Sequence, residues 1–281
     1  MKDISIEGCP VVGTGTFGKV YRLNDEIVVK VYDDPENLPL IKAEQEMSKR
    51  AFVKGIPTAI PFGTARVGGT YGSLFELLDA RNCNDFLIAH PEKTDSIIAE
   101  YAGLVRRIHT IKSEPREFPD TRKVYLDYLA CMKDLMPGEI YSRLADFVSA
   151  VPESQYLTHG DIQMKNIMLS NGEMLLIDMN TMSAGDSAFE FAGLYRTYIA
   201  FNVYDPDNSK NFFGISRELA GKIYYKTAEL CGVDPQRRDI LILGWLRYLH
   251  VITIELSQPD AFMVKPTLET LRRLLDDEGI H

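Results

Sequence analysis

The 281-residue sequence has little of what holds small secreted or metal-bound domains together. Its four cysteines lie far apart, without any Cys-x-x-Cys pair, at Cys9, Cys83, Cys131 and Cys231. Thiols scattered in this way are typical of a reduced protein and argue against a disulfide framework or a cysteine zinc site. The N-terminus lacks a basic segment followed by an apolar stretch, so we predict no signal peptide and expect a cytoplasmic location.

Long hydrophobic runs and an excess of positive charge are lacking as well. The longest apolar stretch, from Ile240 to Leu256, is interrupted by Arg247, His250 and Glu255, which makes it too polar to span a bilayer. The net charge of −9 argues against nucleic acid or an anionic membrane as the main partner, although one local site can still bind an anion. The sequence shows no heptad seam or dimer strand, so the oligomeric state stays open.

The composition that is present, 45% hydrophobic and 25% charged residues, is that of a globular protein with a sizeable core. Strand signals dominate the first part, with one helix predicted from Leu38 to Lys54 and closed by Gly55. Helical periodicity dominates the remainder, apart from a hairpin predicted at Asn171-Gly172. We therefore predict an α+β protein with a small antiparallel β lobe over residues 1–78 and a larger, mostly helical lobe over 79–281. Helices are expected near 97–108, 121–135, 139–150, 186–203, 216–231, 236–256 and 267–277.

A glycine-rich segment, Gly13-Thr14-Gly15-Thr16-Phe17-Gly18, precedes Val20. In a dinucleotide-binding fold a helix follows such glycines directly. Here Val20–Leu23 and Ile27–Tyr32 predict two strands instead. A glycine turn between antiparallel strands can cover phosphates with its backbone N–H groups, and a plain flexible hairpin is the alternative.

Lys30 lies in an apolar strand, where alternation separates it from the valines on either side. Burying an unpaired ammonium is costly, so we expect an anionic ligand or a carboxylate beside it; the alternative is an edge-strand lysine that points to water. In the following helix, Glu44 shares a face with apolar residues, whereas Glu46 shares one with basic residues. We therefore predict an ion pair between Lys30 and Glu44, and a surface position for Glu46.

A third group of polar residues comprises His159-Gly160-Asp161, Asn166 and Asp178. Asn166 and Asp178 flank the predicted hairpin, which brings the two residues close together. Amide and carboxylate oxygens suit Mg²⁺ when phosphate oxygens and waters complete its shell. Asp161 is left nearby as a carboxylate that can accept a proton. Each residue alone could equally cap a turn, but the whole set in this order is much harder to explain structurally.

These residues resemble those of the aminoglycoside phosphotransferase and choline kinase group, over nearly the whole chain and in the same order and spacing. The resemblance implies a bilobal protein-kinase-like fold and transfer of the γ-phosphate to a hydroxyl of a small molecule. It implies ATP, with GTP as the alternative donor, and Mg²⁺ as cofactors. Asp161 would accept the hydroxyl proton, while Asn166 and Asp178 would hold the metal. The implied ATP-binding residues are Gly13, Thr14, Gly15, Thr16, Phe17, Gly18, Val20, Lys30, Glu44, Glu76 and Leu78, the last two through backbone contacts to adenine.

Departures from the protein-kinase pattern favour the small-molecule branch. Gly160 and Gln163 occupy the places where protein kinases carry an arginine and a lysine. Glu190 replaces an aspartate of the family and is interpreted as a residue that supports the site or starts a helix, not as a ligand. A nucleotide-binding pseudokinase is the main alternative, and a protein kinase is a weaker one.

The acceptor is the least determined part of the prediction. Candidate acceptor-binding residues are Asp186, Tyr195, Tyr198 and Trp245, and the alternative is that they belong to helix cores. Aromatic rings with carboxylates suit a cationic or sugar-like molecule. Most of the excess of acidic residues lies beyond residue 80, which favours a cationic or neutral acceptor over an anionic one.

Overall fold

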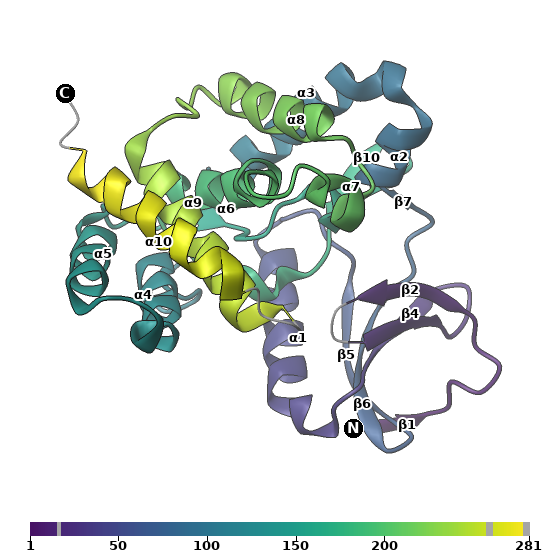
Figure 1. Cartoon of the computed structure of the whole chain (residues 1–281). Coiled ribbons are helices and arrows are strands. Elements are labelled where there is room, and N and C mark those ends of the chain that lie inside the picture. Colours follow the sequence, from purple (N-terminus) through teal and green to yellow (C-terminus); the bar gives the residue numbers. More distant parts are fainter. Residues whose placement is uncertain (16–17, 257–260, 278–281) are drawn as a thin grey trace. The chain divides into compact units, whose positions relative to one another are not determined.

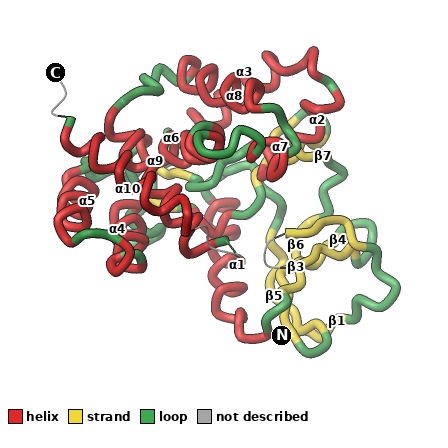
Figure 2. The backbone as a smooth tube through the Cα atoms, viewed as in Figure 1, coloured by secondary structure: helices red, strands yellow, loops and turns green. Residues whose placement is uncertain are grey.

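The structure is a computed structural model of the whole chain (Figure 1), and it describes residues 1–15, 18–256 and 261–277. The chain forms two compact units. The first comprises Met1–Cys83 and Asn166–Thr181, and the second comprises Asn84–Lys165 and Met182–His281. Strands dominate the first unit and helices the second (Figure 2), so the predicted α+β class is confirmed.

A six-stranded sheet in the order β1-β5-β6-β4-β3-β2 forms the basis of the first unit. Neighbouring strands run antiparallel, except for β1 and β5, which are parallel. Strand β4 coincides with the predicted run, whereas β1 and β5 were not predicted, because one is very short and the other contains glycine and proline. The strands are β1 (Lys2–Ile4), β2 (Val11–Gly15), β3 (Gly18–Arg22), β4 (Ile27–Tyr32), β5 (Pro61–Val67) and β6 (Thr70–Glu76).

The two faces of β4 have different surroundings. Val29 and Val31 pack with Ala65 and Val67 into a buried apolar cluster. Because side chains alternate along a strand, Lys30 lies on the opposite face. The sheet thus provides an apolar face that stabilises the unit and a second face that carries the lysine.

Helix α1 (Leu38–Val53) follows a 3-10 turn, η1 (Pro35–Asn37), and packs against β5 and β6. Gln45 fixes its position, because its amide donates to the Leu74 carbonyl at 3.1 Å and accepts from the Gly63 N–H at 2.9 Å. The helix ends as predicted at Gly55, whose φ of 77° is in the left-handed region. These contacts turn one face of α1, including Glu44, toward the sheet.

The hairpin of β9 (Ile167–Ser170) and β10 (Glu173–Leu176) turns at Asn171-Gly172, as predicted. Both turn residues have positive φ angles, 50° and 82°, which a type I′ turn requires. The prediction placed this hairpin in the second lobe and ended the first lobe at residue 78. In the structure the hairpin belongs to the first unit, which also extends to Cys83.

Backbone pairing explains this different division of the chain. Strand β7 (Arg81–Asn82) pairs with β9. The Leu176 N–H donates to the Pro57 carbonyl at 2.8 Å, and the Thr58 hydroxyl donates to the Leu176 carbonyl at 2.7 Å. These are long-range pairings that no local sequence pattern reports.

The second unit is mainly helical (Figure 1). Helices α6 and α9 pack closely together at its centre, and α4, α8 and α10 contact one or both of them. Strand β8 (Leu157–Thr158) pairs with β11 (Ser183–Ala184) beside them. The helices are α2 (Cys83–Ala89), α3 (Thr94–Ile108), α4 (Thr121–Cys131), α5 (Gly138–Ala150), α6 (Ser187–Tyr198), α7 (Asn208–Phe213), α8 (Arg217–Leu230), α9 (Arg238–His250) and α10 (Ala261–Asp276).

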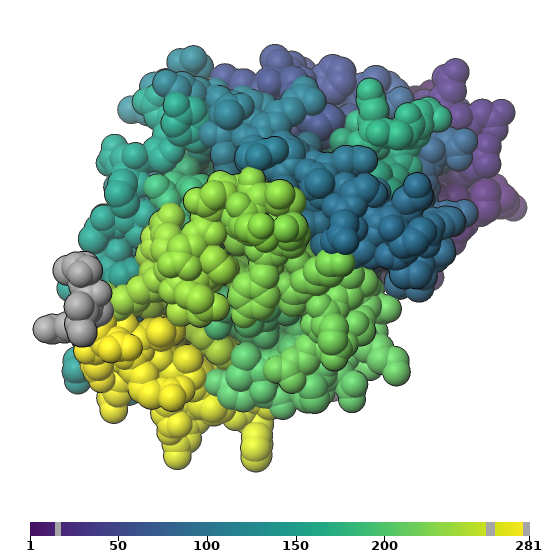
Figure 3. All heavy atoms as spheres, turned by 90° about the horizontal axis from the view of Figure 1, so that it is seen from above, coloured from purple at the N-terminus to yellow at the C-terminus, as the bar shows by residue number. Residues whose placement is uncertain are grey.

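Helix α6 is buried on all sides, from Ala188 to Tyr198. It approaches α9 closely at Gly244, where a Cβ atom would lie 2.6 Å from the Tyr195 ring and 3.1 Å from the Ala192 carbonyl oxygen. On another side α8 lies along α3 (Figure 3), and the Arg106 guanidinium donates to the Leu230 carbonyl at 2.9 Å. A helix enclosed in this way offers a rigid support for neighbouring loops.

Most helices lie near their predicted positions, and the differences concern short elements and ends. The short helices α2 and α7 were not predicted. Helix α9 is shorter than expected and continues as a π-helical turn over Val251–Glu255, and α10 begins before the predicted residue 267. Among the helices that the structure describes, none has the length and apolar character needed to cross a membrane.

Gly18→Ala tests the backbone constraint at the start of β3. A Cβ atom there would lie 1.9 Å from the Val31 carbonyl oxygen, and φ is 154°. We expect this substitution to lower the free energy of unfolding by about 2 kcal/mol or more, measured by thermal and urea denaturation.

Gly13→Ala is the matched control, because its Cβ atom would meet only Val20, at an ordinary 3.5 Å. The midpoints of its thermal and urea denaturation should stay close to those of the wild type. Equal destabilisation by the two substitutions would contradict the proposed constraint.

Candidate active site

Lys30 lies between two carboxylates in the first unit. Its Nζ is 2.7 Å from Glu44 Oε1 and 2.6 Å from Asp178 Oδ1. The predicted ion pair with Glu44 is confirmed. Glu46, by contrast, pairs with Arg50 on the exposed side of α1, as expected from the helix geometry. The helix faces on which Glu44 and Glu46 lie therefore identified the partner of Lys30 correctly.

Glu44 is held by more than the lysine. Its carboxylate accepts hydrogen bonds from the Tyr32 hydroxyl and from Ser73 Oγ, the latter at 3.1 Å. Burial, reinforced by the charge of Glu44, raises the pKa of the Tyr32 hydroxyl and keeps it a donor at neutral pH. Glu44 is thus positioned by three groups from β4 and β6 and can in turn fix the direction of the Lys30 side chain.

The Lys30 ammonium stays protonated although its side chain is only 17% exposed. Burial by itself would lower the pKa of Lys30, but the charges of Asp178 and Glu44 outweigh burial and raise the pKa above its usual value. A permanently charged ammonium with one side open to solvent can bind an anionic oxygen.

Asn166 and Asp178 flank the β9–β10 hairpin. The Ile177 N–H donates to the Asn166 carbonyl at 3.0 Å, so the hairpin returns the chain to Asn166 as predicted. Asp178 has a φ of 58°, a left-handed conformation that is uncommon for a non-glycine residue and frequent at functional positions. The hairpin therefore places two oxygen-bearing side chains at its base, one of them bonded to Lys30.

The described part of the glycine-rich segment lies at the end of β2 and the start of β3. Gly13, Thr14 and Gly15 lie at the end of β2, and Gly18 and Val20 lie in β3 opposite them. Val20 is also paired in register with Lys30 of β4. Thr16 and Phe17 lie outside the described residues. The strand after the glycines, expected in place of the helix of a dinucleotide fold, is present.

Glu76 and Leu78 lie where β6 ends. The Glu76 N–H donates to the Ile60 carbonyl at 2.9 Å, and the Leu77 N–H donates to the Glu26 carbonyl at 2.7 Å. These two amides are therefore used within the unit. Contact of adenine with the backbone of Glu76 and Leu78 stays a prediction.

The loop that carries Asp161 is held by Glu190 of α6 in the second unit. The His159 N–H donates to Glu190 Oε2 at 2.6 Å, and the Gly160 N–H donates to Oε1 at 3.0 Å. Burial would raise the pKa of Glu190, but the His109 imidazole, whose Nε2 lies 3.6 Å from Oε2, together with His159 and its amide, lowers it. Glu190 therefore supports the loop as an ionised carboxylate, in line with its interpretation as a supporting residue.

Asp161 itself is bound at both carboxylate oxygens. Arg196 Nη2 donates to Oδ1 at 2.8 Å, and Gln163 Nε2 donates to Oδ2 at 3.0 Å. Burial would raise the pKa of Asp161, but the charge of Arg196 and the bond from Gln163 lower it below its usual range. The side chain remains 24% exposed. It is thus an ionised, oriented and accessible carboxylate.

The tyrosines and the tryptophan predicted to bind the acceptor are buried in the structure, and their role in acceptor binding stays a prediction. Tyr198 is buried, and its hydroxyl accepts the Met164 N–H at 2.8 Å, so it holds the loop that carries Asp161. Tyr195 and Trp245 are buried and pack edge to face. Aromatic rings on central helices fill the core because they bury large apolar areas, and the structure gives these three no open face toward an acceptor.

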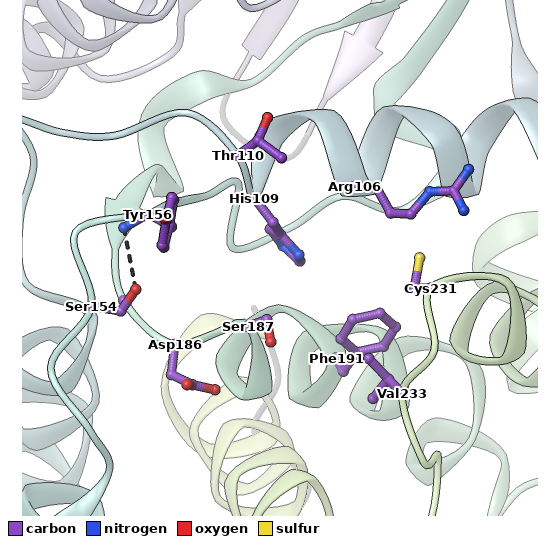
Figure 4. A pocket seen from close by; sticks show the side chains of 11 residues that line it. Arg106, His109, Thr110, Ser154, Tyr156, Asp186, Ser187, Phe191, Cys231 and Val233 are labelled. Carbon is purple, nitrogen blue, oxygen red and sulfur yellow. Dashed lines mark hydrogen bonds between the residues drawn. The ribbon is translucent and has the colours of Figure 1, made fainter.

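Asp186 has a different position from Asp161. Its carboxylate caps α6 by accepting the Ala188 N–H at 2.8 Å. It also lines a cavity of about 390 Å³ at the start of α6, into which Phe191 and His109 point (Figure 4). Asp161 does not line this cavity, so the structure gives no support for Asp186 as part of an acceptor site around Asp161.

Sequence reasoning missed Arg196. The signal was present, because a single arginine stands in the otherwise uncharged segment Phe191–Asn202. A charged residue within a helix that is otherwise apolar needs a partner, which is the argument that identified Lys30. Without the fold, however, Asp161 could not be chosen as that partner.

The fold and the two sets of residues define a kinase-like phosphotransferase. Residues 11–212 match the phosphotransferase enzyme family. The chain belongs to this family, which confirms the predicted resemblance and the predicted enzyme class, a small-molecule kinase. No curated protein matches the chain.

Solved structures with the same fold have low sequence identity to the chain. A ternary complex of a thermostable mutant of aminoglycoside phosphotransferase APH(4)-Ia with ADP and hygromycin B has a TM-score of 0.64 and 13% identity, covering 96% of both chains. The streptomycin-ATP complex of APH(2")-IIa has a TM-score of 0.60 and 12% identity, covering 95% of this chain and 93% of that one. APH(3'')-Id from Streptomyces rimosus has a TM-score of 0.60 and 19% identity, with coverages of 86% and 93%.

Glu44→Gln tests the role of the carboxylate in orienting Lys30. The substitution removes the negative charge that faces the ammonium but preserves the size of the side chain. We expect the dissociation constant of a non-hydrolysable ATP analogue to rise about tenfold or more, since hydrogen bonds to charged groups contribute about 1.5–3 kcal/mol.

Glu46→Gln is its control, because it removes an exposed pair two residues away on the same helix. Analogue affinity should change less than twofold, as expected for a surface ion pair worth about 0–1 kcal/mol. Calorimetric titration of both variants measures the difference, and similar losses would contradict a specific role for Glu44.

Proposed function

We propose that the protein transfers the γ-phosphate of ATP to a hydroxyl group of a small molecule, with Asp161 as the base. The observation that carries this proposal is Lys30, a partly buried cation of β4 that is bonded to Glu44 of α1 and to Asp178 at the end of the β9–β10 hairpin. Such a lysine can bind phosphate oxygens while its carboxylates keep it charged and oriented. Membership of the phosphotransferase enzyme family supports the reaction class.

Nucleotide binding is assigned to the first unit. Lys30 would bind the α- and β-phosphates, and the glycine turn from Gly13 to Gly18 would cover them with backbone N–H groups. Glu76 and Leu78 would bind adenine through their backbone. ATP is the proposed phosphate donor, supported by the similar structures that hold ADP or ATP. The test below also measures GTP as the alternative donor.

The donor set fits Mg²⁺. The Asn166 amide oxygen and the Asp178 carboxylate oxygen that does not bond Lys30 are hard ligands of the type that Mg²⁺ prefers. Among the residues described, no group of three or more His, Cys, Asp or Glu side chains could hold a metal by itself. An ion shared with phosphate oxygens is therefore the arrangement that these donors suit. Bound Mg²⁺ would supply positive charge to the phosphates.

Asp161 is proposed to orient the acceptor hydroxyl and to take its proton. Its lowered pKa keeps it ionised at neutral pH, so it is ready to accept a hydrogen bond. The loop around it needs little rearrangement, because Glu190 already holds the two preceding amides. Lys165 in the same loop is exposed, and we assign it no role in this step.

The acceptor is proposed to be a hydroxylated small molecule, and a cationic or sugar-like one remains the first hypothesis. Similar structures hold hygromycin B and streptomycin. The aromatic residues expected to recognise such an acceptor lie in the core, however. Identification of the acceptor therefore depends on a screen, with aminoglycosides, choline-like amines, sugars and amino-alcohols as its arms.

The test measures nucleotide consumption with MgATP or MgGTP over this panel, for the wild type and for Asp161→Asn. We expect at least one acceptor to raise the rate of the wild type. Asp161→Asn should lower that rate about 10²–10⁴-fold, the usual contribution of a general base, while affinity for the nucleotide analogue changes less than twofold.

Asp146→Asn, an exposed aspartate on α5, is the control and should leave the rate unchanged. A wild type that binds ATP but consumes none with any acceptor would favour the pseudokinase alternative. Phosphorylation of proteins in preference to small molecules would favour a protein kinase. Loss of nucleotide binding in Asp161→Asn would contradict the assigned role.

A further inference from the structure

Arg196 is a buried cation in direct contact with the proposed base. It lies near the end of α6, and its side chain is 9% exposed. Its Nη2 donates to Asp161 Oδ1 at 2.8 Å. A guanidinium is costly to bury without a counter-ion, so this contact needs an explanation beyond the packing of a helix.

Asp161 is the main group that compensates the charge of the Arg196 guanidinium. Among the described residues, Asp161 is its only ion-pair partner, and its Nε is buried without a hydrogen-bond partner. A buried polar atom left unsatisfied costs stability. A residue selected for stability alone would be better replaced by an apolar side chain of similar length. The arrangement therefore favours a role connected with Asp161.

Other polar groups face the Asp161 carboxylate from several elements, namely His159 of its own loop, Arg247 of α9 and Tyr128 of α4. Arg247 is engaged elsewhere, because its guanidinium donates to Glu255, contacts His250 Nδ1 at 3.0 Å and lies over the Tyr128 ring. Arg196 is therefore the cation that directly bonds the carboxylate.

The catalytic loop lacks the cation that protein kinases have there. Gln163 stands two residues beyond Asp161, where those enzymes carry a lysine, and its amide bonds Asp161 Oδ2 without adding charge. The guanidinium reaches the same carboxylate from a different element. It does so from the helix that also holds the loop through Glu190 and Tyr198.

We propose that Arg196 is a positioning residue for phosphoryl transfer, which holds Asp161 in its productive orientation and places beside it, from α6, a positive charge that the neutral Gln163 does not supply. This inference rests on the proposed function, because it assumes that Asp161 is the base. Each carboxylate oxygen has two lone pairs. The bonds from Arg196 and Gln163 fix the direction of the carboxylate, whose side chain is 24% exposed. A nearby fixed cation also stabilises negative charge that develops during transfer.

The experiment compares Arg196→Met, Arg196→Lys and Arg247→Met, each in the wild-type background, together with the double variant Asp161→Asn/Arg196→Met. Arg247→Met is the matched control, because Arg247 is an equally buried arginine on α9 whose ion pair is with Glu255. MgATP consumption is measured with the best acceptor of the panel, or with water as acceptor if none raises the rate. Thermal denaturation sets an assay temperature at which every variant is folded.

We expect Arg196→Met to lower kcat about 10–100-fold, less than the roughly 10²–10³-fold lost when a donor to the transition state itself is removed, because Arg196 acts through Asp161. KM for MgATP and the affinity for the ATP analogue should change less than about twofold, because nucleotide binding is assigned to the other unit. Arg196→Lys should recover most of the lost kcat, since it restores the charge. Arg247→Met should keep kcat within about threefold of the wild type.

The double variant separates this inference from the proposed function. If Arg196 acts through Asp161, its removal should lower the rate of Asp161→Asn by less than about threefold. The inference would be overturned if Arg196→Met lowered the rate of Asp161→Asn as much as it lowers that of the wild type, or if Arg247→Met lost as much kcat as Arg196→Met. It would also be overturned if Arg196→Met raised KM for MgATP and left kcat unchanged. An Asp161→Asn variant as active as the wild type would instead refute the proposed function.

Discussion

The second unit depends on the enclosure of one helix, α6, and on the carboxylate of Glu190 that it carries. Two consecutive loop amides donate to this buried group. A buried carboxylate without such donors would be unstable, and buried amides without an acceptor would be as well. Each therefore requires the other, and the resulting loop holds Asp161 at a fixed point. Arg196 and Tyr198 add two further contacts from the same helix.

The first unit also encloses a charged group, but one of the opposite sign. Lys30 is a partly buried cation, and Glu44 and Asp178 are its partners. The carboxylates come from a helix and from the end of a hairpin, so the ion pairs connect segments far apart in the chain. In both units a group of one charge is ionised and oriented by groups of the other charge. Phosphoryl transfer needs such preorganisation, because its chemistry consists mainly of positioning and charge stabilisation.

The sequence predicted the parts of the site that local rules govern. Strand alternation placed Lys30 opposite the valines, helical spacing selected Glu44 over Glu46, and Asn171-Gly172 specified the hairpin that returns the chain to Asn166. Three acceptor candidates are buried in the structure, which the sequence could not show, because an aromatic side chain looks the same in a sequence whether it lines a site or fills a core. Arg196 was missed because its partner is distant in sequence.

By itself, then, the sequence determined the α+β class, the order of the main elements and the family. These depend on short-range periodicity and on the spacing of motifs. Only the tertiary structure decided that the β9–β10 hairpin joins the first unit, that Tyr198 supports the loop, and that Arg196 meets Asp161. Each of these depends on which surfaces pack together over long sequence separations, and burial and charge compensation, unlike periodicity, are properties of the packed chain.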